Sequence, residues 1–179
     1  MVFAHDTEVA LRSAMNLINT SANGAELLPD DGHLTAFLTR EEFYGSRTHD
    51  DAELASVRRL RDVLRALWTS PEDEAAEEVN RILRDARALP QLMKHDGLDW
   101  HLHATTHEAP LADRIATETA MGILDVIRSK ELSRLALCAA EDCDAAVLDL
   151  SRNRSKRFCD TGNCANRTHV AAYRARQRS

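Results

Sequence analysis

The chain has 179 residues, of which 44% are hydrophobic and 29% are charged, and its six glycines and four prolines exclude collagen-like and low-complexity classes. Residues 1–149 hold 15 Lys and Arg against 28 Asp and Glu, whereas residues 150–179 hold eight basic residues and one acidic residue. No run approaches the roughly 18 apolar residues of a membrane span, and the opening MVFAHDTEVA lacks a secretory signal pattern, so we expect a globular cytoplasmic protein without membrane contact.

Most of the chain before the cysteines is predicted to be helical. Apolar residues recur at helical spacing in four segments: residues 9–18, 54–68, 79–86 and 111–127. Thr39 followed by Glu42 has the pattern of a capping box and predicts a helix start. Ser70 before Pro71 predicts another start. The fold is therefore expected to be mainly α.

One β-hairpin is predicted within this helical part. Asp96-Gly97 can adopt the positive φ of a tight turn, which would join strands at Leu92–His95 and Leu98–His103. No other segment before the cysteines has a comparable pattern of alternation around a turn.

Three histidines lie on or after the second of these strands. His101 and His103 would share one strand face, with His107 four residues later, and neutral imidazoles can bind a metal ion. Alternation on a half-exposed strand produces the same spacing without any ligand, so a second metal site here is the less favoured alternative.

All four cysteines fall within a short segment near the C-terminus. They form two close pairs, Cys138-x4-Cys143 and Cys159-x4-Cys164, as two loops that converge on one ion require. Zinc prefers four thiolates in a tetrahedron, and a closed shell leaves no position for a catalytic water, so we predict one structural Zn²⁺. Two disulfides are disfavoured in a reducing compartment, and an iron–sulfur cluster is a minor alternative.

The basic tail is predicted to contact DNA. A helix beginning near Cys164 would carry a basic stripe and, on another side, Val170 and Tyr173, which could pack on the zinc site or the body. The basic stripe consists of Arg167, Arg174 and Arg178. Four more cations lie between the cysteine pairs: Arg152, Arg154, Lys156 and Arg157. These side chains could bind phosphates or base edges, or some could only offset the negative charge of the zinc-thiolate centre.

The C-terminal part resembles a known family. The cysteine pairs, the SRNRSKRFC segment and the CANRTHVAAYRAR ending are similar to the CGNR zinc finger, a C-terminal module of bacterial proteins. Ala165 stands where the family has Gly, and Phe158 where Trp is common, but neither change removes a ligand. The preceding chain, with NLINT at residues 16–20, the helix at 57–68 and Val79-Asn80, resembles the ABATE-type domain that usually precedes this finger.

These resemblances imply a domain organisation and a function. They imply a helical ABATE-like domain over residues 1–134 that senses a ligand or dimerises, and a small treble-type zinc module with a C-terminal helix over residues 135–179. The implied function is that of a DNA-binding transcriptional regulator, with a role in the stress response. The ligands carried over from the family are Cys138, Cys143, Cys159 and Cys164.

Other functional classes are kept as alternatives. The sequence contains no nucleophile elbow, phosphate-binding glycine loop or H-E-x-x-H motif, so we expect no enzyme. An RNA-binding or protein-interaction module with a structural zinc is the second reading, although only Phe158 and Tyr173 could stack on bases. The third is a body that binds a small-molecule effector through polar groups among apolar helix faces. Its candidate residues are Asn19, Arg61 and Asn80.

Overall fold

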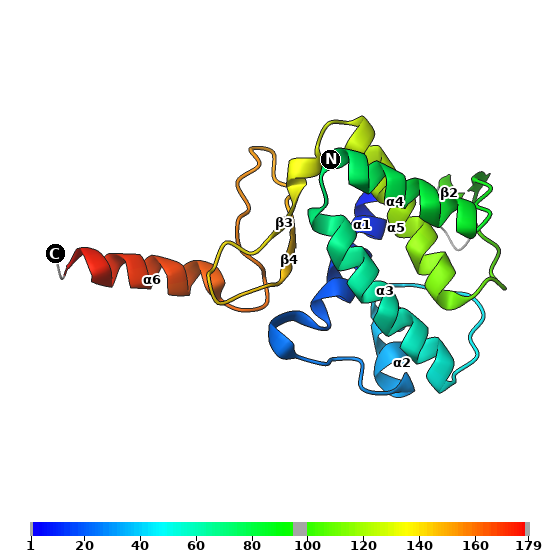
Figure 1. Ribbon diagram of the computed structural model, residues 1–179, viewed down its shortest axis with the longest axis horizontal. Helices are drawn as coiled ribbons and strands as arrows, with labels where there is room; N and C mark the ends of the chain where they lie inside the picture. The colour runs from blue at the N-terminus through cyan, green and yellow to red at the C-terminus, as the bar shows by residue number, and fades with distance from the viewer. Residues whose placement is uncertain (1, 95–99, 178–179) are drawn as a thin grey trace.

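The computed structural model describes residues 2–94 and 100–177. In this part, six α-helices, two short 3-10 turns and two hairpins follow one another along the chain (Figure 1). The elements are α1 (His5–Asn19), η1 (Ala22–Gly24), α2 (Asp31–Arg40), α3 (Asp51–Thr69), α4 (Glu72–Asp85), β1 (Gln91–Met93), β2 (His101–His103), α5 (Leu111–Arg128), η2 (Leu132–Arg134), β3 (Leu135–Leu137), β4 (Ala146–Leu148) and α6 (Cys164–Arg176). The mainly helical fold expected from the sequence is confirmed.

The helical body is built around α5, which packs against α1, α3 and α4. The apolar stripes predicted from helical spacing line the contacts between these helices, with Leu17, Leu64 and Ile123 among the fully buried side chains. Trp68 near the end of α3 is also buried, and its indole N–H reaches the carbonyl oxygen of Val147 in β4 (3.3 Å). The body therefore has its own hydrophobic core, which extends to the zinc module through α3.

Two helix starts in the body are fixed by aspartates. The Asp30 carboxylate accepts a hydrogen bond from the backbone N–H of His33 at the start of α2 (2.9 Å). The Asp50 carboxylate accepts one from the N–H of Glu53 at the start of α3 (2.7 Å). Each carboxylate satisfies an N–H group that has no partner within its own helix.

The helix start predicted at Thr39 is wrong. Thr39 lies in the last turn of α2, and Glu42 follows the helix with a left-handed φ of 54°. The backbone N–H of Phe43 then bonds to the carbonyl of Leu38 (2.9 Å), which closes the C-terminal end of the helix. The start predicted at Ser70-Pro71 agrees with the structure, because α4 begins at Glu72 directly after Pro71.

The predicted hairpin is present as the antiparallel pair β1–β2, in which Leu92 lies opposite Leu102. The proposed turn at Asp96-Gly97 lies outside the described residues. A second antiparallel pair, β3–β4, was not expected from the sequence and places Leu137 opposite Ala146. This second hairpin carries the first two cysteines at its closed end.

Helix α6 projects from the zinc module, away from the helical body, and forms one end of the elongated molecule (Figure 1). Among its described side chains, only that of Cys164 at the first position is buried. Within the described residues, no helix, α6 included, is both long enough and apolar enough to cross a membrane.

Candidate metal centre and nucleic-acid interface

Four cysteines from three structural contexts converge at the base of α6. Cys138 directly follows β3, Cys143 lies three residues before β4, Cys159 belongs to an irregular loop and Cys164 is the first residue of α6. Their Sγ atoms all lie within 4.8 Å of one another. The fold thus collects all four predicted metal ligands in one cluster.

The spacing of the sulfurs fits a tetrahedral zinc ion. Zinc–thiolate bonds of about 2.3 Å place the sulfurs of an ideal tetrahedron about 3.8 Å apart. The Sγ atom of Cys159 lies 3.7 Å from that of Cys143 and 3.6 Å from that of Cys164. The module is therefore a structural site for one zinc ion, and its shell is closed by protein ligands.

The ionisation of the thiols also favours a cation at this place. Burial raises the pKa of the Cys164 thiol to about 12, and hydrogen bonds with the other thiols add to the increase. Burial would also raise the pKa of Cys159, but hydrogen bonds from the hydroxyl and backbone N–H of Thr161 lower it to about 6. Four thiolates at such close spacing require a compensating charge, which a divalent ion supplies.

The backbone before α6 leaves room for the metal centre. A Cβ atom on Gly162 would lie 2.9 Å from Sγ of Cys164 and 3.7 Å from Sγ of Cys159. Asn163 then takes a left-handed conformation (φ of 51°) and leads into the helix. Ala165 lies inside the first turn of α6 with no positive φ, so alanine fits here where the resembled family has glycine.

Arg167 serves the metal centre as well as the surface. Its Nη2 atom lies 3.3 Å from Sγ of Cys164 and 2.9 Å from a carboxylate oxygen of Asp142. The guanidinium therefore offsets thiolate charge and ties α6 to the loop between Cys138 and Cys143. The expectation that some cations neutralise the centre applies to this residue.

The other cations predicted to bind nucleic acid are distributed over the loop and the helix. Arg154 pairs with Glu131 (2.7 Å) and Lys156 with Asp160 (2.6 Å). Arg152, Arg157 and Arg174 are exposed, and Arg178 lies outside the described residues. Arg176, which was not predicted as a contact residue, is also exposed in the last turn of α6, two residues after Arg174.

The apolar side chains of α6 do not pack on the body, contrary to the expectation from the sequence. Val170 and Tyr173 are 39% and 57% exposed, because the helix extends away from the rest of the molecule. Phe158, in contrast, packs on the buried cysteines, and its ring meets that of His169 edge-on with centroids 6.0 Å apart. Of the two aromatic side chains considered for base stacking, only Tyr173 is presented on the surface.

The three residues suggested for effector binding have separate environments. The Asn19 amide bonds to the backbone of Ala146 in β4. Arg61 is buried, and its guanidinium bonds to the carboxylate of Glu26 (2.6 and 2.8 Å) and to the hydroxyl of Thr20 (3.0 Å). Two of the three residues therefore have partners within the protein.

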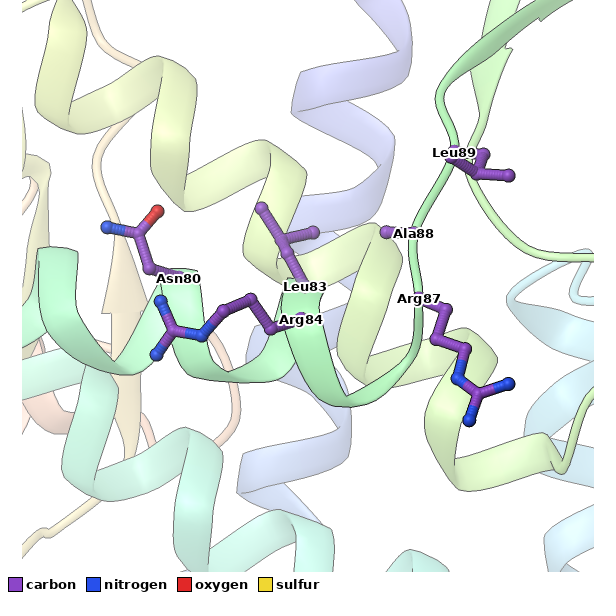
Figure 2. A pocket seen from close by; sticks show the side chains of 6 residues that line it. All are labelled: Asn80, Leu83, Arg84, Arg87, Ala88 and Leu89. Carbon is purple, nitrogen blue, oxygen red and sulfur yellow. The ribbon is translucent and has the colours of Figure 1, made fainter.

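Asn80 is exposed on α4, at one end of a shallow depression (Figure 2). The depression has a volume of about 380 Å³, and neither Asn19 nor Arg61 lines it. Its walls are formed by Asn80, Leu83, Arg84, Arg87, Ala88 and Leu89. An open surface of this kind does not enclose a ligand in the way that typical small-molecule pockets do.

The histidines of the first hairpin form a small cluster. The Nε2 atoms of His101 and His103 lie 2.9 Å apart, and the rings of His103 and His107 have centroids 5.9 Å apart. Within residues 2–94 and 100–177, the four cysteines are the only group of three or more potential ligands close enough to share an ion. Among these described residues, the histidines therefore do not form the three-ligand group that the second metal site, left as an alternative by the sequence, would need.

Some residues that surround the cysteines were not predicted from the sequence. Asn23 donates from Nδ2 to Sγ of Cys143 (3.7 Å), although 120 residues separate the two positions. No pattern in the sequence connects these residues. Gly162, by contrast, lies three residues after Cys159 and two residues before Cys164. A glycine between two ligands is a sequence signal that the backbone passes close to another group.

Two family models match the chain. The ABATE model, described as "Putative stress-induced transcription regulator", matches residues 11–143. The CGNR zinc finger model matches residues 134–177. The two matches share residues 134–143, which contain β3 and the first cysteine pair. No curated protein matches the chain.

Proposed function

Because the chain belongs to the ABATE family and ends in a CGNR zinc finger, we propose that it is a zinc-dependent, DNA-binding transcriptional regulator. In this proposal the zinc module presents α6 to DNA, and the helical body senses an effector or dimerises. The protein is then a binding protein rather than an enzyme, and it works in the reducing cytoplasm, where zinc thiolates persist.

The observation that carries the proposal is the free projection of α6. The helix has 13 residues, ends in Arg174 and Arg176 and extends beyond the body (Figure 1). A major groove about 12 Å wide admits a single α-helix, and arginine can bond there to guanine or to phosphate. Arg152 and Arg157 are exposed on the loop before the helix, where they can add backbone contacts.

The distribution of charge supports the same orientation. The chain up to residue 149 is strongly acidic, whereas residues 150–179, which include the last two cysteines and α6, are basic. DNA would repel the body and attract the module, because association follows the local field and not the net charge alone. The part of the molecule with the free helix is thus also the part that a polyanion attracts.

Single-stranded RNA is a less suitable partner for this surface. Binding of unpaired bases depends on aromatic platforms, and Phe158 is already packed against the cysteines. Tyr173 is the only Phe, Tyr or Trp side chain of α6, and it is exposed. The proposal therefore favours duplex DNA.

The test is equilibrium binding of the zinc-loaded chain to a randomised duplex pool over a salt series, with the bound DNA sequenced. We expect affinity to fall steeply with salt, because each phosphate contact releases counterions. Arg174→Ala should weaken binding about tenfold, and loss of one phosphate contact should lower the salt slope by about one. Arg59→Ala removes an exposed arginine from α3 and is the matched control, which should bind as the unchanged protein does.

The possible outcomes separate the alternatives. Enrichment of a motif supports a sequence-specific regulator, and binding without enrichment supports a nonspecific grip on phosphates. Binding that does not depend on salt, or that Arg59→Ala weakens as much as Arg174→Ala, contradicts the assignment to α6. Absence of binding at low salt would leave the module a role in docking another protein.

A further inference from the structure

At Ala146, the outer edge of β4 is covered by a side chain of the helical body. β3 pairs with one edge of β4, so the backbone N–H and C=O of Ala146 point away from that partner. The Asn19 amide donates to the carbonyl of Ala146 (3.0 Å), and its Oδ1 accepts from the N–H of Ala146 (2.7 Å). Asn19, the last residue of α1, thus makes the two bonds that a neighbouring strand would make.

Asn23, one turn further along the chain, reaches a zinc ligand. Its backbone N–H donates to the Asp144 carboxylate (2.6 Å), and its Oδ1 accepts from the backbone N–H of Asp144 (3.1 Å). The remaining group, Nδ2, donates to Sγ of Cys143 at 3.7 Å. Asn23 has a left-handed φ of 55°, a conformation that asparagine tolerates better than most residues.

Helix α3 holds the same segment from a second side. Arg65 donates from Nη1 to the carbonyl of Asp144 (2.6 Å) and from Nη2 to the carbonyl of Ile18 near the end of α1 (3.1 Å). The Trp68 indole N–H is directed at the carbonyl of Val147. Contacts from α1, η1 and α3 therefore fix residues 143–147, which run from the second ligand into β4.

We propose that Asn19 and Asn23 are positioning residues of the zinc centre, so that the helical domain supplies part of the hydrogen-bonded shell that holds Cys143 on the metal. Asn23 acts on the ligand atom, and Asn19 acts on β4, the strand that follows the ligand. The proposal does not depend on DNA binding, because it concerns only how this chain holds its zinc.

The physical basis is the charge on the thiolate sulfur. An N–H group directed at a metal-bound thiolate disperses its negative charge and fixes its orientation. Loss of such an outer partner typically lowers metal affinity by roughly 10- to 100-fold. The zinc module of this chain then depends on residues that lie more than a hundred positions before its ligands.

The test uses the full chain and two substitutions of Asn23. Asn23→Gly removes the amide but keeps a residue that accepts the left-handed φ. Asn23→Asp keeps an oxygen that can accept the Asp144 N–H but replaces the donor to sulfur with a carboxylate. Asn16→Ala is the matched control, because Asn16 lies on α1, as Asn19 does, and its amide bonds to the Glu41 carboxylate (3.0 and 3.1 Å) instead.

The first readout is the rate of zinc release to a chromogenic chelator. We expect both Asn23 variants to release zinc about 10- to 100-fold faster than the unchanged chain, and Asn16→Ala to release it at the unchanged rate. Asn19→Ala should also accelerate release. Far-UV circular dichroism of each variant checks that the helical body is folded before zinc release is compared.

The second readout is the thiolate-to-metal charge-transfer band of the Co²⁺-substituted protein. Removal of a hydrogen bond raises the energy of the sulfur lone pair, so we expect this band to shift to longer wavelength in Asn23→Gly. If Asn23 only stabilised the contact between the helical body and the zinc module, its substitution would lower thermal stability and leave the wavelength of this band unchanged. Unchanged release and an unchanged band in both Asn23 variants would overturn the proposal.

Discussion

At Gly162 the backbone passes so close to the sulfur of Cys164 that a Cβ atom could not be added without a shift of the surroundings. The Cβ of an alanine would lie 2.9 Å from Sγ of Cys164, which is well inside van der Waals contact. The obstacle is a metal ligand at the start of a helix and not a flexible side chain that could turn aside. Either the loop or the sulfur would have to move.

We therefore expect Gly162→Ala to weaken zinc binding by at least tenfold, since ligand displacement costs more than the loss of an outer contact. Competition with a chelator of known affinity measures this effect. Ala165→Gly is a useful comparison, because it lies in the first turn of α6 and should cost only about 0.5–1 kcal/mol of helix stability. Equal zinc affinity in Gly162→Ala and the unchanged chain would contradict the steric argument.

Glu118 on α5 gives the body a dependence on pH. Burial raises the pKa of this carboxyl to about 7, although the charge of Arg114 opposes the increase. In the unfolded chain the value is near 4.5, so the folded state binds a proton more tightly. The contribution of Glu118 to stability is therefore fully present below about pH 4.5 and is lost as the pH rises through 7.

The substitution Glu118→Gln should remove this dependence. At pH 8 we expect the variant to be more stable than the unchanged chain by up to about 3 kcal/mol, and the difference should shrink towards pH 5. Denaturant unfolding of the two proteins at matched pH and zinc concentration measures the difference, in which the titration of the thiols cancels. A constant difference across this pH range would show that Glu118 does not carry the effect.

At the scale of elements, α6 depends on the metal more than any other helix. Its first residue is a ligand, its other described side chains are not buried, and a free helix of 13 residues is marginal in water. Zinc is thus the main anchor that fixes the beginning of the helix. The helices of the body, by contrast, share a continuous apolar core.

Removal of zinc by a chelator should melt α6 and leave the body helices folded. We expect a loss of far-UV helical signal that corresponds to about the 13 residues of α6, and its recovery when zinc is restored. Near-UV signals of Trp68, which is buried in the body, report whether the core persists. Full helicity after complete zinc release would show that α6 is stable alone.

Elements differ in how far the sequence predicts them. The long helices have several turns of apolar spacing, as in the stripe that includes Leu60, Leu64 and Leu67, and so they could be predicted. β3 and β4 have three residues each, and their connection contains a cysteine pair instead of a glycine turn. Strands of this length show no usable alternation, and the metal closes the hairpin.

The candidate site also contains residues that the sequence predicts and residues that it does not. The cysteine spacing predicts the ligand cluster, because the chemistry of zinc limits which residues can serve. The spacing cannot predict Asn19 or Asn23 as partners of β4 and Cys143, because those contacts arise only when distant segments pack. Thr39 and Glu42 show the converse error, in which a local pattern is present but the helix has already begun at Asp31.

At the scale of the whole molecule, charge is distributed unevenly along the sequence and therefore also along the long axis of the structure. Acidic residues outnumber basic residues up to position 149, and basic residues predominate in the C-terminal part that ends in α6, which extends along the long axis away from the body (Figure 1). The organisation into an acidic body and a basic tail could be deduced from the sequence. The distance between the two parts could not, because it follows from the projection of α6.

This unequal distribution of charge gives the molecule an electric dipole whose positive end lies towards α6. In the field of any polyanion the dipole experiences a torque, so the protein rotates during diffusion and arrives with the helix leading. The same field that attracts the tip pushes the body outward, and two molecules held side by side on one polyanion repel each other through their bodies. This repulsion limits how closely the molecules can be spaced along the polyanion. Salt screens the repulsion between the bodies, and it also weakens the attraction of α6 to the polyanion.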